Sequence, residues 1–314
     1  MRIVALAGGI GGARFLRGLR QAAPEADITV IGNTGDDISL FGLRVCPDLD
    51  TVMYTLGGGI NEEQGWGRAD ERFTIREELA AYEVGPSWFT LGDRDFGTHI
   101  VRSQMLDAGY PLSAVTEALC ARWKPGVRLL PMSDDRVETH VVIEDAEGRR
   151  AVHFQEWWVR LHAQVPARSI VAVGAEDAKP APGVLEALEA ADVVILPPSN
   201  PVVSVGTILA VPGIRPAVAA KTVVGVSPII GGAPVRGMAD ACLTAIGVET
   251  SAGAVAAHYG PDLLDGWLVD TADSDLDGDL DGIAVRSRPL LMTDVDAAAA
   301  IARAALDLAA ELGS

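Results

Sequence analysis

Four aspartates lie close together early in the chain, just after a glycine-rich turn. The turn is Gly8-Gly9-Ile10-Gly11-Gly12, and the acidic residues are Asp36, Asp37, Asp48 and Asp50. A glycine-rich turn at a helix N-terminus can hold phosphate, because the backbone approaches the ligand closely and the helix end attracts anions. Carboxylates and phosphates repel one another unless a divalent cation lies between them. The combination predicts a Mg²⁺-dependent phosphoryl or nucleotidyl transfer, with Asp36 and Asp50 as candidate metal ligands and catalytic bases.

The spacing of Asp48 and Asp50 leaves two interpretations open. In an extended segment both side chains point the same way. In a helix they diverge, and Asp50 would then be the N-cap of a helix that starts at Thr51. Capping explains one aspartate and not the group of four. A second charged turn, Asp93-Arg94-Asp95, is read with equal weight as a functional loop or as a solvated loop that caps a helix at Thr98.

The glycine turn matches neither of the common nucleotide fingerprints. Arg14 stands where a GxGxxG motif started at Gly9 would have its last glycine, and no Lys-Ser/Thr pair follows. The physical capacity to bind phosphate is still present, so we expect the nucleotide at Gly9, Gly11 and Gly12. The proline-flanked pair Ser199 and Asn200 follows another apolar run and is expected to contact the nucleotide as well.

The elements needed to position these residues read as an α/β fold. Residues 2–7 and 27–32 are apolar runs typical of buried parallel strands, and residues 13–23 between them show helical periodicity. Residues 71–124 then change to helical patterns, which predicts a helical insertion. We therefore expect one α/β domain over residues 1–314, with a Rossmann-like, mostly parallel sheet.

The remaining expected elements follow from the same patterns. Within the insertion we predict helices over residues 71–82, 98–108 and 112–123. Strands are predicted over residues 139–143, 151–154, 169–173, 193–196, 222–226, 267–270 and 284–286, and helices over 183–190 and 294–312. From residue 169 onward we expect α/β alternation, so that the strand at 169–173 joins the main sheet.

The amino-acid composition argues against some classes of binding partner. The net charge of −18 opposes a nucleic-acid partner or an acidic membrane, because both require basic patches. An anionic substrate must therefore meet local arginines, backbone N–H groups or a metal. The chain shows no leader sequence and no apolar run long enough to span a membrane, so a cytoplasmic location is expected.

Five sequence blocks together resemble one enzyme family. They are GGIGGARF, NTGDD, CPDLDTVMYTLGGGINEEQGWG, LGDRDFGTHIVRSQML and PPSNP, in this order along the chain. They resemble the 2-phospho-L-lactate transferases of coenzyme F-420 biosynthesis, called phosphoenolpyruvate transferases in actinobacteria. The resemblance implies transfer of a phospho-acid from its diphosphoguanosine adduct to the ribityl hydroxyl of the deazaflavin precursor Fo, with release of GMP. It also implies a homodimer.

The resemblance assigns Fo binding to Asp50 and Arg94. Metal binding by Asp36 or Asp50 is inferred from the acidic cluster and not from the family. A high share of arginine among the basic residues is typical of a GC-rich genome, which favours phosphoenolpyruvate over phospholactate as the acid carried. Two alternatives are a non-enzymatic nucleotide-sugar-binding regulator of the same superfamily and a nicotinamide oxidoreductase. The complete PDLD and GDRD blocks oppose the regulator, and the broken GxGxxG opposes the oxidoreductase.

Overall fold

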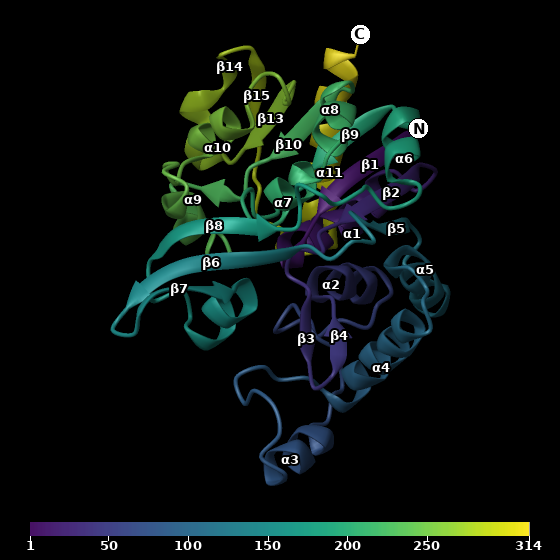
Figure 1. The fold of residues 1–314 in the computed structure, drawn as a ribbon. Helices are drawn as coiled ribbons and strands as arrows, with labels where there is room; N and C mark the ends of the chain where they lie inside the picture. Colours follow the sequence, from purple (N-terminus) through teal and green to yellow (C-terminus); the bar gives the residue numbers. More distant parts are fainter. Residues whose placement is uncertain (314) are drawn as a thin grey trace.

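A computed structural model describes residues 1–313, and its centre is a sheet of eight strands (Figure 1). The strand order is β14-β15-β13-β10-β9-β1-β2-β5, and every neighbouring pair is parallel except β14 and β15. The strands are β1 (Arg2–Ala7), β2 (Asp27–Gly32), β5 (Arg128–Pro131), β9 (Val193–Leu196), β10 (Val223–Val226), β13 (Gly266–Val269), β14 (Gly278–Leu280) and β15 (Ile283–Ser287). This architecture confirms the predicted Rossmann-like fold.

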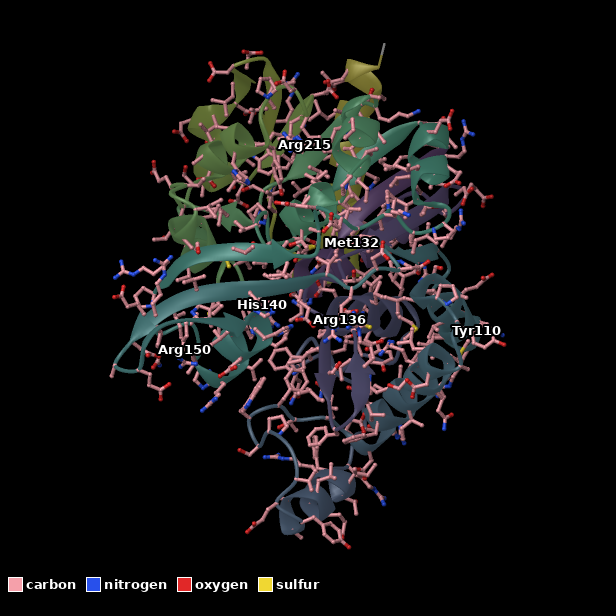
Figure 2. The ribbon with its side chains drawn as sticks, viewed as in Figure 1. Tyr110, Met132, Arg136, His140, Arg150 and Arg215 are labelled. Atoms are coloured by element: carbon pink, nitrogen blue, oxygen red, sulfur yellow. The ribbon has the colours of Figure 1, made fainter. Side chains whose placement is uncertain are left out.

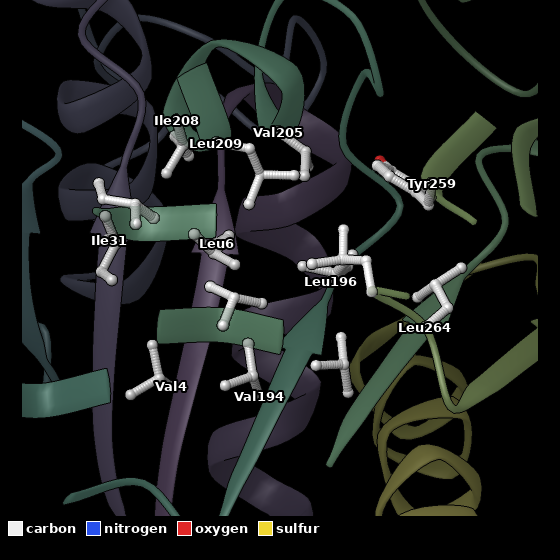
Figure 3. Close-up of a cluster of buried hydrophobic side chains, with 14 of the residues drawn as sticks. Val4, Leu6, Ile31, Val194, Leu196, Val205, Ile208, Leu209, Tyr259 and Leu264 are labelled. Carbon is white, nitrogen blue, oxygen red and sulfur yellow. The ribbon is translucent and has the colours of Figure 1, made fainter. Parts of the chain in front are cut away.

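Both faces of the sheet are covered, which is why its strands read as continuous apolar runs. Side chains alternate along β1, so Val4 and Leu6 join one buried cluster while Ile3 and Ala5 join the other. Figure 3 shows Val4 and Leu6 in the first cluster, below Ile208. The first face is covered by α6 (Val184–Ala190), α7 (Val205–Ala210), α8 (Ile214–Ala219), α9 (Ala239–Ala245) and α10 (Ala252–Tyr259), and the second by α1 (Gly9–Ala22), α2 (Pro47–Leu56), α5 (Leu112–Trp123) and α11 (Val295–Leu312).

A second sheet of three antiparallel strands lies below the main sheet in Figure 1. It contains β6 (Glu138–Asp145), β7 (Gly148–His153) and β8 (Ala167–Val173) in the order β7-β6-β8. The expectation that residues 169–173 join the main sheet is therefore wrong. Burial alternates along β6, as in a strand covered on one face only, and this pattern distinguishes the second sheet from the first.

The helical insertion is confirmed between β2 and β5, with different boundaries. Its helices are α3 (Thr74–Ala81), α4 (Asp93–Asp107) and α5 (Leu112–Trp123). Helix α4 starts at Asp93 and not at Thr98, because Glu71 accepts hydrogen bonds from the backbone N–H groups of Arg94 and Asp95, both at 2.8 Å. Asp93 in turn accepts from the first N–H groups of α3. The idea that Asp93 and Asp95 cap a helix at Thr98 is therefore wrong.

Short elements complete the chain. They are the hairpin of β3 (Ile38–Leu40) and β4 (Leu43–Val45), the pair β11 (Ile229–Ile230) and β12 (Ala233–Pro234), the π-helix η1 (Glu156–Arg160) and the 3₁₀ helix η2 (Thr271–Leu276). No helix within residues 1–313 is long and apolar enough to cross a membrane.

Candidate functional site

The glycine-rich turn lies at the carboxyl end of β1, beside β9. From these two neighbouring strands the sheet continues in opposite directions, to β2 and to β10. Open α/β sheets bind ligands at such a reversal of strand order. Helix α1 begins at Gly9 and not at Ala13, so the turn is the first turn of the helix itself.

The loop after β9 is fixed to this turn by packing and hydrogen bonds. A Cβ on Gly11 would collide with the Pro198 carbonyl oxygen, and one on Gly12 would collide with the Ser199 hydroxyl. The Ser199 hydroxyl accepts from Gly8 N at 3.1 Å and donates to Gly8 O at 2.8 Å. The structure therefore brings the predicted nucleotide-binding segments together, and it uses the Ser199 hydroxyl to hold them in place.

Asn200 shapes the same loop. Its side-chain oxygen accepts from the backbone N–H groups of Val202 and Val203, at 2.9 and 3.2 Å. These bonds form a tight turn just before α7. Asn200 is half-buried, which leaves part of its side chain within reach of a ligand at this edge of the sheet.

Asp48 connects α2 to the glycine turn. Its Oδ1 accepts from Gly9 N at 2.8 Å, and its Oδ2 accepts from the Asn33 side chain at 2.9 Å. Asn33 also donates to Val203 O at 3.1 Å and accepts from Gly35 N at 2.9 Å, so it joins three segments of the site. Asn33 was not among the site residues predicted from the sequence. Its position directly after β2, at the carboxyl edge, was the available signal.

The carboxylates at this edge are deeply buried. Burial raises the pKa of Asp36 well above its ordinary value, and the neighbouring Asp48 carboxylate raises it further. Burial also raises the pKa of Asp48, to about 6, against the hydrogen bonds from Asn33 and Gly9. Among residues 1–313, Asp36 Oδ1 has no hydrogen-bond partner. Asp36 therefore offers a buried oxygen with a strong tendency to take up a proton or a cation.

Asp37 lies beside these carboxylates but is paired. Its Oδ2 contacts Arg44 on β4 and the Cys46 thiol, both at 3.0 Å. Burial raises the pKa of Asp37 to about 6, and Arg44 works against that rise. The β3–β4 hairpin is the element that provides this arginine.

The second sheet covers the acidic loop. Thr139 at the start of β6 donates its backbone N–H to Gly35 O at 2.6 Å, and the His153 ring contacts Asp37 O at 3.1 Å through Nε2. Figure 2 shows Arg136 and His140 in the middle of the molecule, between the main sheet and the lobe formed by α2, β3 and β4. The loop with Asp36 and Asp37 is therefore enclosed between two sheets.

Asp50 has a different environment from Asp48. The region is helical from Pro47, with Cys46 at the N-cap position, so the interpretation of Asp50 as an N-cap is wrong. Two residues along a helix correspond to a rotation of about 200°, so the two aspartates diverge. Asp50 contacts Arg102 of α4 through both carboxylate oxygens, and the pair is almost completely buried. Its Oδ2 also lies 3.7 Å from His99 Nδ1.

The α2–α4 contact continues toward Arg94. The Tyr54 hydroxyl donates to Asp95 Oδ1 at 2.7 Å, and His99 Nε2 lies 3.4 Å from the same oxygen. Arg94 is the neighbour of Asp95, at the end of the contact far from Asp50. No hydrogen bond or ion pair joins Asp50 and Arg94 within residues 1–313, although buried side chains connect their surroundings.

Arg94 lines a pocket of about 410 Å³ at the C-terminal end of α2. Two guanidinium groups lie against the Trp123 ring, with Arg68 at 4.8 Å and Arg122 at 4.6 Å from its centroid. Within the described part of the chain, no carboxylate forms an ion pair with Arg68, Arg94 or Arg122. The lining residues are Gly57, Gly58, Gly59, Arg68, Ala69, Asp70, Arg94, Arg122 and Trp123. The pocket combines unpaired positive charge with an aromatic ring, which suits an aromatic ligand with polar or anionic edges.

Metal binding at Asp36 and Asp50 stays a prediction. The structure brings Asp36 close to Asp48 and pairs Asp50 with Arg102. Over residues 1–313, no three His, Cys, Asp or Glu side chains form a group that could hold a metal ion by themselves. Mg²⁺ prefers oxygen ligands and is usually held by one or two carboxylates together with substrate phosphates. The unpartnered Asp36 oxygen fits such a shared site.

Comparisons with known proteins find relatives over the whole chain. The family model of the 2-phospho-L-lactate transferase CofD matches residues 3–288. The phosphoenolpyruvate transferase of Thermobifida fusca is 74% identical over 99% of this chain and 99% of its own, and that of Nocardia farcinica is 59% identical over 98% and 95%. A solved structure, protein BH3568 from Bacillus halodurans, is similar with a TM-score of 0.61 over 97% of this chain and 99% of that one. Its identity is 19%, so it shows the fold alone.

Proposed function

The chain belongs to the 2-phospho-L-lactate transferase CofD family, and from this we propose that it transfers a phospho-acid to the deazaflavin Fo in coenzyme F-420 biosynthesis. The donor is the phospho-acid joined to GMP through a diphosphate. The ribityl hydroxyl oxygen of Fo forms a bond to the phosphorus of the phospho-acid, and the P–O bond to GMP breaks. A phosphodiester is formed, GMP leaves, and the hydroxyl proton passes to a base.

The observation that carries this proposal is the position of α2 between two sites of different chemistry. At its N-terminal end, Asp48 is bound to the glycine turn. At its C-terminal end, Gly57 lines the pocket that contains Arg94. The helix has 10 residues, so its ends lie about 15 Å apart. A tricyclic deazaflavin with an extended ribityl chain is long enough to cover much of that distance.

We assign the donor to the glycine turn and the acceptor to the pocket. The first-turn N–H groups of α1 and the helix dipole favour a diphosphate at Gly9, Gly11 and Gly12, next to the loop with Ser199 and Asn200. The pocket offers Arg94, together with the guanidinium groups of Arg68 and Arg122 that lie against the Trp123 ring, for the polar edges of Fo. This assignment separates the negative donor from the aromatic part of the acceptor.

Asp36 is the base that the buried environment supports best. Burial and the neighbouring Asp48 carboxylate raise its pKa well above the ordinary value, so Asp36 takes up a proton more readily than an exposed aspartate does. If Mg²⁺ binds, Asp36 would hold it together with the donor diphosphate, and the ion would neutralise charge on the phosphates. Both Asp50 oxygens contact Arg102, so a direct role for Asp50 toward metal or Fo would require that ion pair to open.

The acid carried is proposed to be phosphoenolpyruvate. Relatives that are 59–74% identical over nearly their full length carry the name phosphoenolpyruvate transferase. The family model itself is named for phospholactate, so the family alone does not decide between the two acids.

A turnover assay tests the reaction directly. The purified protein is incubated with Fo and either the phosphoenolpyruvate or the phospholactate adduct of GMP, and the products are identified by mass spectrometry. We expect one GMP released for each phosphodiester, with the phosphoenolpyruvate adduct preferred. Asp36→Asn should lower turnover by at least about a hundredfold, whereas Asp307→Asn, an exposed control on α11, should not. Tight nucleotide binding with no Fo product would favour the regulator instead.

A further inference from the structure

The loop between α2 and α3 lies across the first turn of α1. A Cβ placed on Gly65 would lie 2.8 Å from Ile10 Cδ1 and 3.2 Å from Arg236 Nη1. Gly65 has a φ of +80°, which favours glycine at this position. Three segments therefore meet over the glycine turn: α1, the loop around Gly65, and the segment between β12 and α9 that carries Arg236.

This meeting point holds two arginines that no carboxylate neutralises by direct contact. Arg14, on α1, donates to the Glu62 carbonyl oxygen at 3.5 Å. The Glu62 carboxylate pairs with Arg17 at 2.8 Å, so Arg14 is left without an ion pair in residues 1–313. Arg236 likewise has no ion pair in that range. Burial lowers the pKa of Arg14 and repulsion from Arg236 lowers it further, whereas the nearby Glu62 carboxylate, which pairs with Arg17, raises it.

Arg14 is half-buried and Arg236 is exposed, and neither charge is balanced by a direct ion pair within residues 1–313, although the chain has a net charge of −18. Their position beside the turn assigned to the diphosphate places them near the other end of the donor, the three-carbon acid. A carboxylate is planar and matches the fork of a guanidinium group.

We propose that Arg14 and Arg236 bind the carboxylate of the phospho-acid carried by the donor. This inference rests on the proposed function, because it assigns one group of that donor. The α1 N-terminus holds the diphosphate, and the two arginines fix the acid end, so the phosphorus between them is held in one orientation. The pair therefore selects an acid over a neutral group of the same size.

The test compares donor and nucleotide binding in Arg236→Gln and Arg14→Gln, with Arg303→Gln as an exposed control on α11. Isothermal titration calorimetry measures the Kd for GDP and for the phosphoenolpyruvate adduct of GMP. Loss of a charge-assisted contact should weaken adduct binding about tenfold or more in either variant, while the Kd for GDP stays unchanged. An adduct whose carboxylate is replaced by a carboxamide should bind wild type and variants alike.

Two results would overturn the proposal. An equal loss of affinity for GDP and the adduct would place the arginines on the diphosphate. Unchanged affinity for the adduct in both variants would leave them without a role in donor recognition. The binding readout is independent of turnover: if wild type forms no Fo product but both variants lose their preference for the carboxylated adduct, the proposed reaction fails and the carboxylate site stands.

Discussion

Asp50→Asn should destabilise the folded protein, because Asp50 neutralises a buried arginine. The Asp50–Arg102 pair joins α2 to α4, and Arg102 is 2% exposed. Asparagine has nearly the same volume as aspartate, so the substitution leaves no cavity and removes only the charge. Arg102 keeps contacts with the Arg44 carbonyl oxygen at 3.3 Å and with His99 Nδ1 at 3.1 Å.

The expected loss in the free energy of unfolding follows from the cost of leaving the Arg102 charge buried without a partner. Removing one partner of a buried ion pair costs about 3–5 kcal/mol in the free energy of unfolding. Asparagine can still accept one hydrogen bond from Arg102, so we expect about 3 kcal/mol. For a chain of this size, that corresponds to a decrease in Tm of roughly 5–10 °C.

Thermal unfolding at pH 8, followed by circular dichroism, measures this effect. The double variant Asp50→Asn/Arg102→Gln removes both charges and should be more stable than the sum of the single changes predicts. Asp48→Asn is the matched control on the same helix, because Asp48 is a buried carboxylate with a raised pKa and loses unfavourable charge. The amide keeps only one of the two accepting oxygens, for Gly9 N or for Asn33, so that variant should lose some stability at pH 8, but less than Asp50→Asn.

A different result would refute the reasoning. If Asp50→Asn unfolds at the wild-type temperature but loses turnover, the ion pair does not hold α2 on α4. Asp50 would then act on the substrate directly, as the family resemblance implies.

Four further predictions concern the sites at the two ends of α2 and the carboxylates between the sheets. Arg94→Ala should raise the KM for Fo about tenfold and leave the Kd for GDP unchanged, because Arg94 lines the pocket proposed for Fo and not the glycine turn. Asn200→Ala should weaken GDP binding more than Fo binding; Asn200→Asp keeps the loop bonds and separates loop shape from nucleotide contact. EDTA should abolish turnover and Mg²⁺ should restore it, and full activity in metal-free buffer would exclude the metal. The pKa of Asp48 is raised to about 6 from 3.8, so its stabilising contribution is complete below about pH 4 and is lost as pH rises through 6. Wild type should therefore lose stability relative to Asp48→Asn between about pH 4 and pH 6 in urea titrations, with little further change above about pH 7.

The parts of the fold that sequence predicted well are those whose burial is uniform. Strand β9 spans the predicted residues 193–196, since all four side chains are buried in a sheet covered on both faces. The start of α4 was not predictable in the same way. Its first turn is satisfied by Glu71, which lies far away in the sequence, and no local pattern reveals that bond.

The candidate site also has parts that the sequence predicts and parts that it does not. The expectation that the glycine turn and the Ser199 loop lie together holds, because both follow neighbouring strands of one sheet, and Ser199 contacts Gly8 and Gly12. The sequence left the orientation of Asp48 and Asp50 open, and only the helix that begins at Pro47 decides it. Arg102 and Arg236 were not selected at all, because their significance depends on side chains brought close by tertiary structure.

The net charge and the proposed substrates are compatible because positive charge is concentrated locally. An acidic surface repels polyanions over long distances, but salt screens that field beyond roughly 8–10 Å. Within that range, a small anion is affected mainly by the groups that it contacts. Arg14 and Arg236 stand at the glycine turn, and Arg68, Arg94 and Arg122 stand in the pocket. Under the proposed function, local positive charge at the two ends of α2 lets an acidic protein bind a small anionic donor at one end and a polar aromatic acceptor at the other.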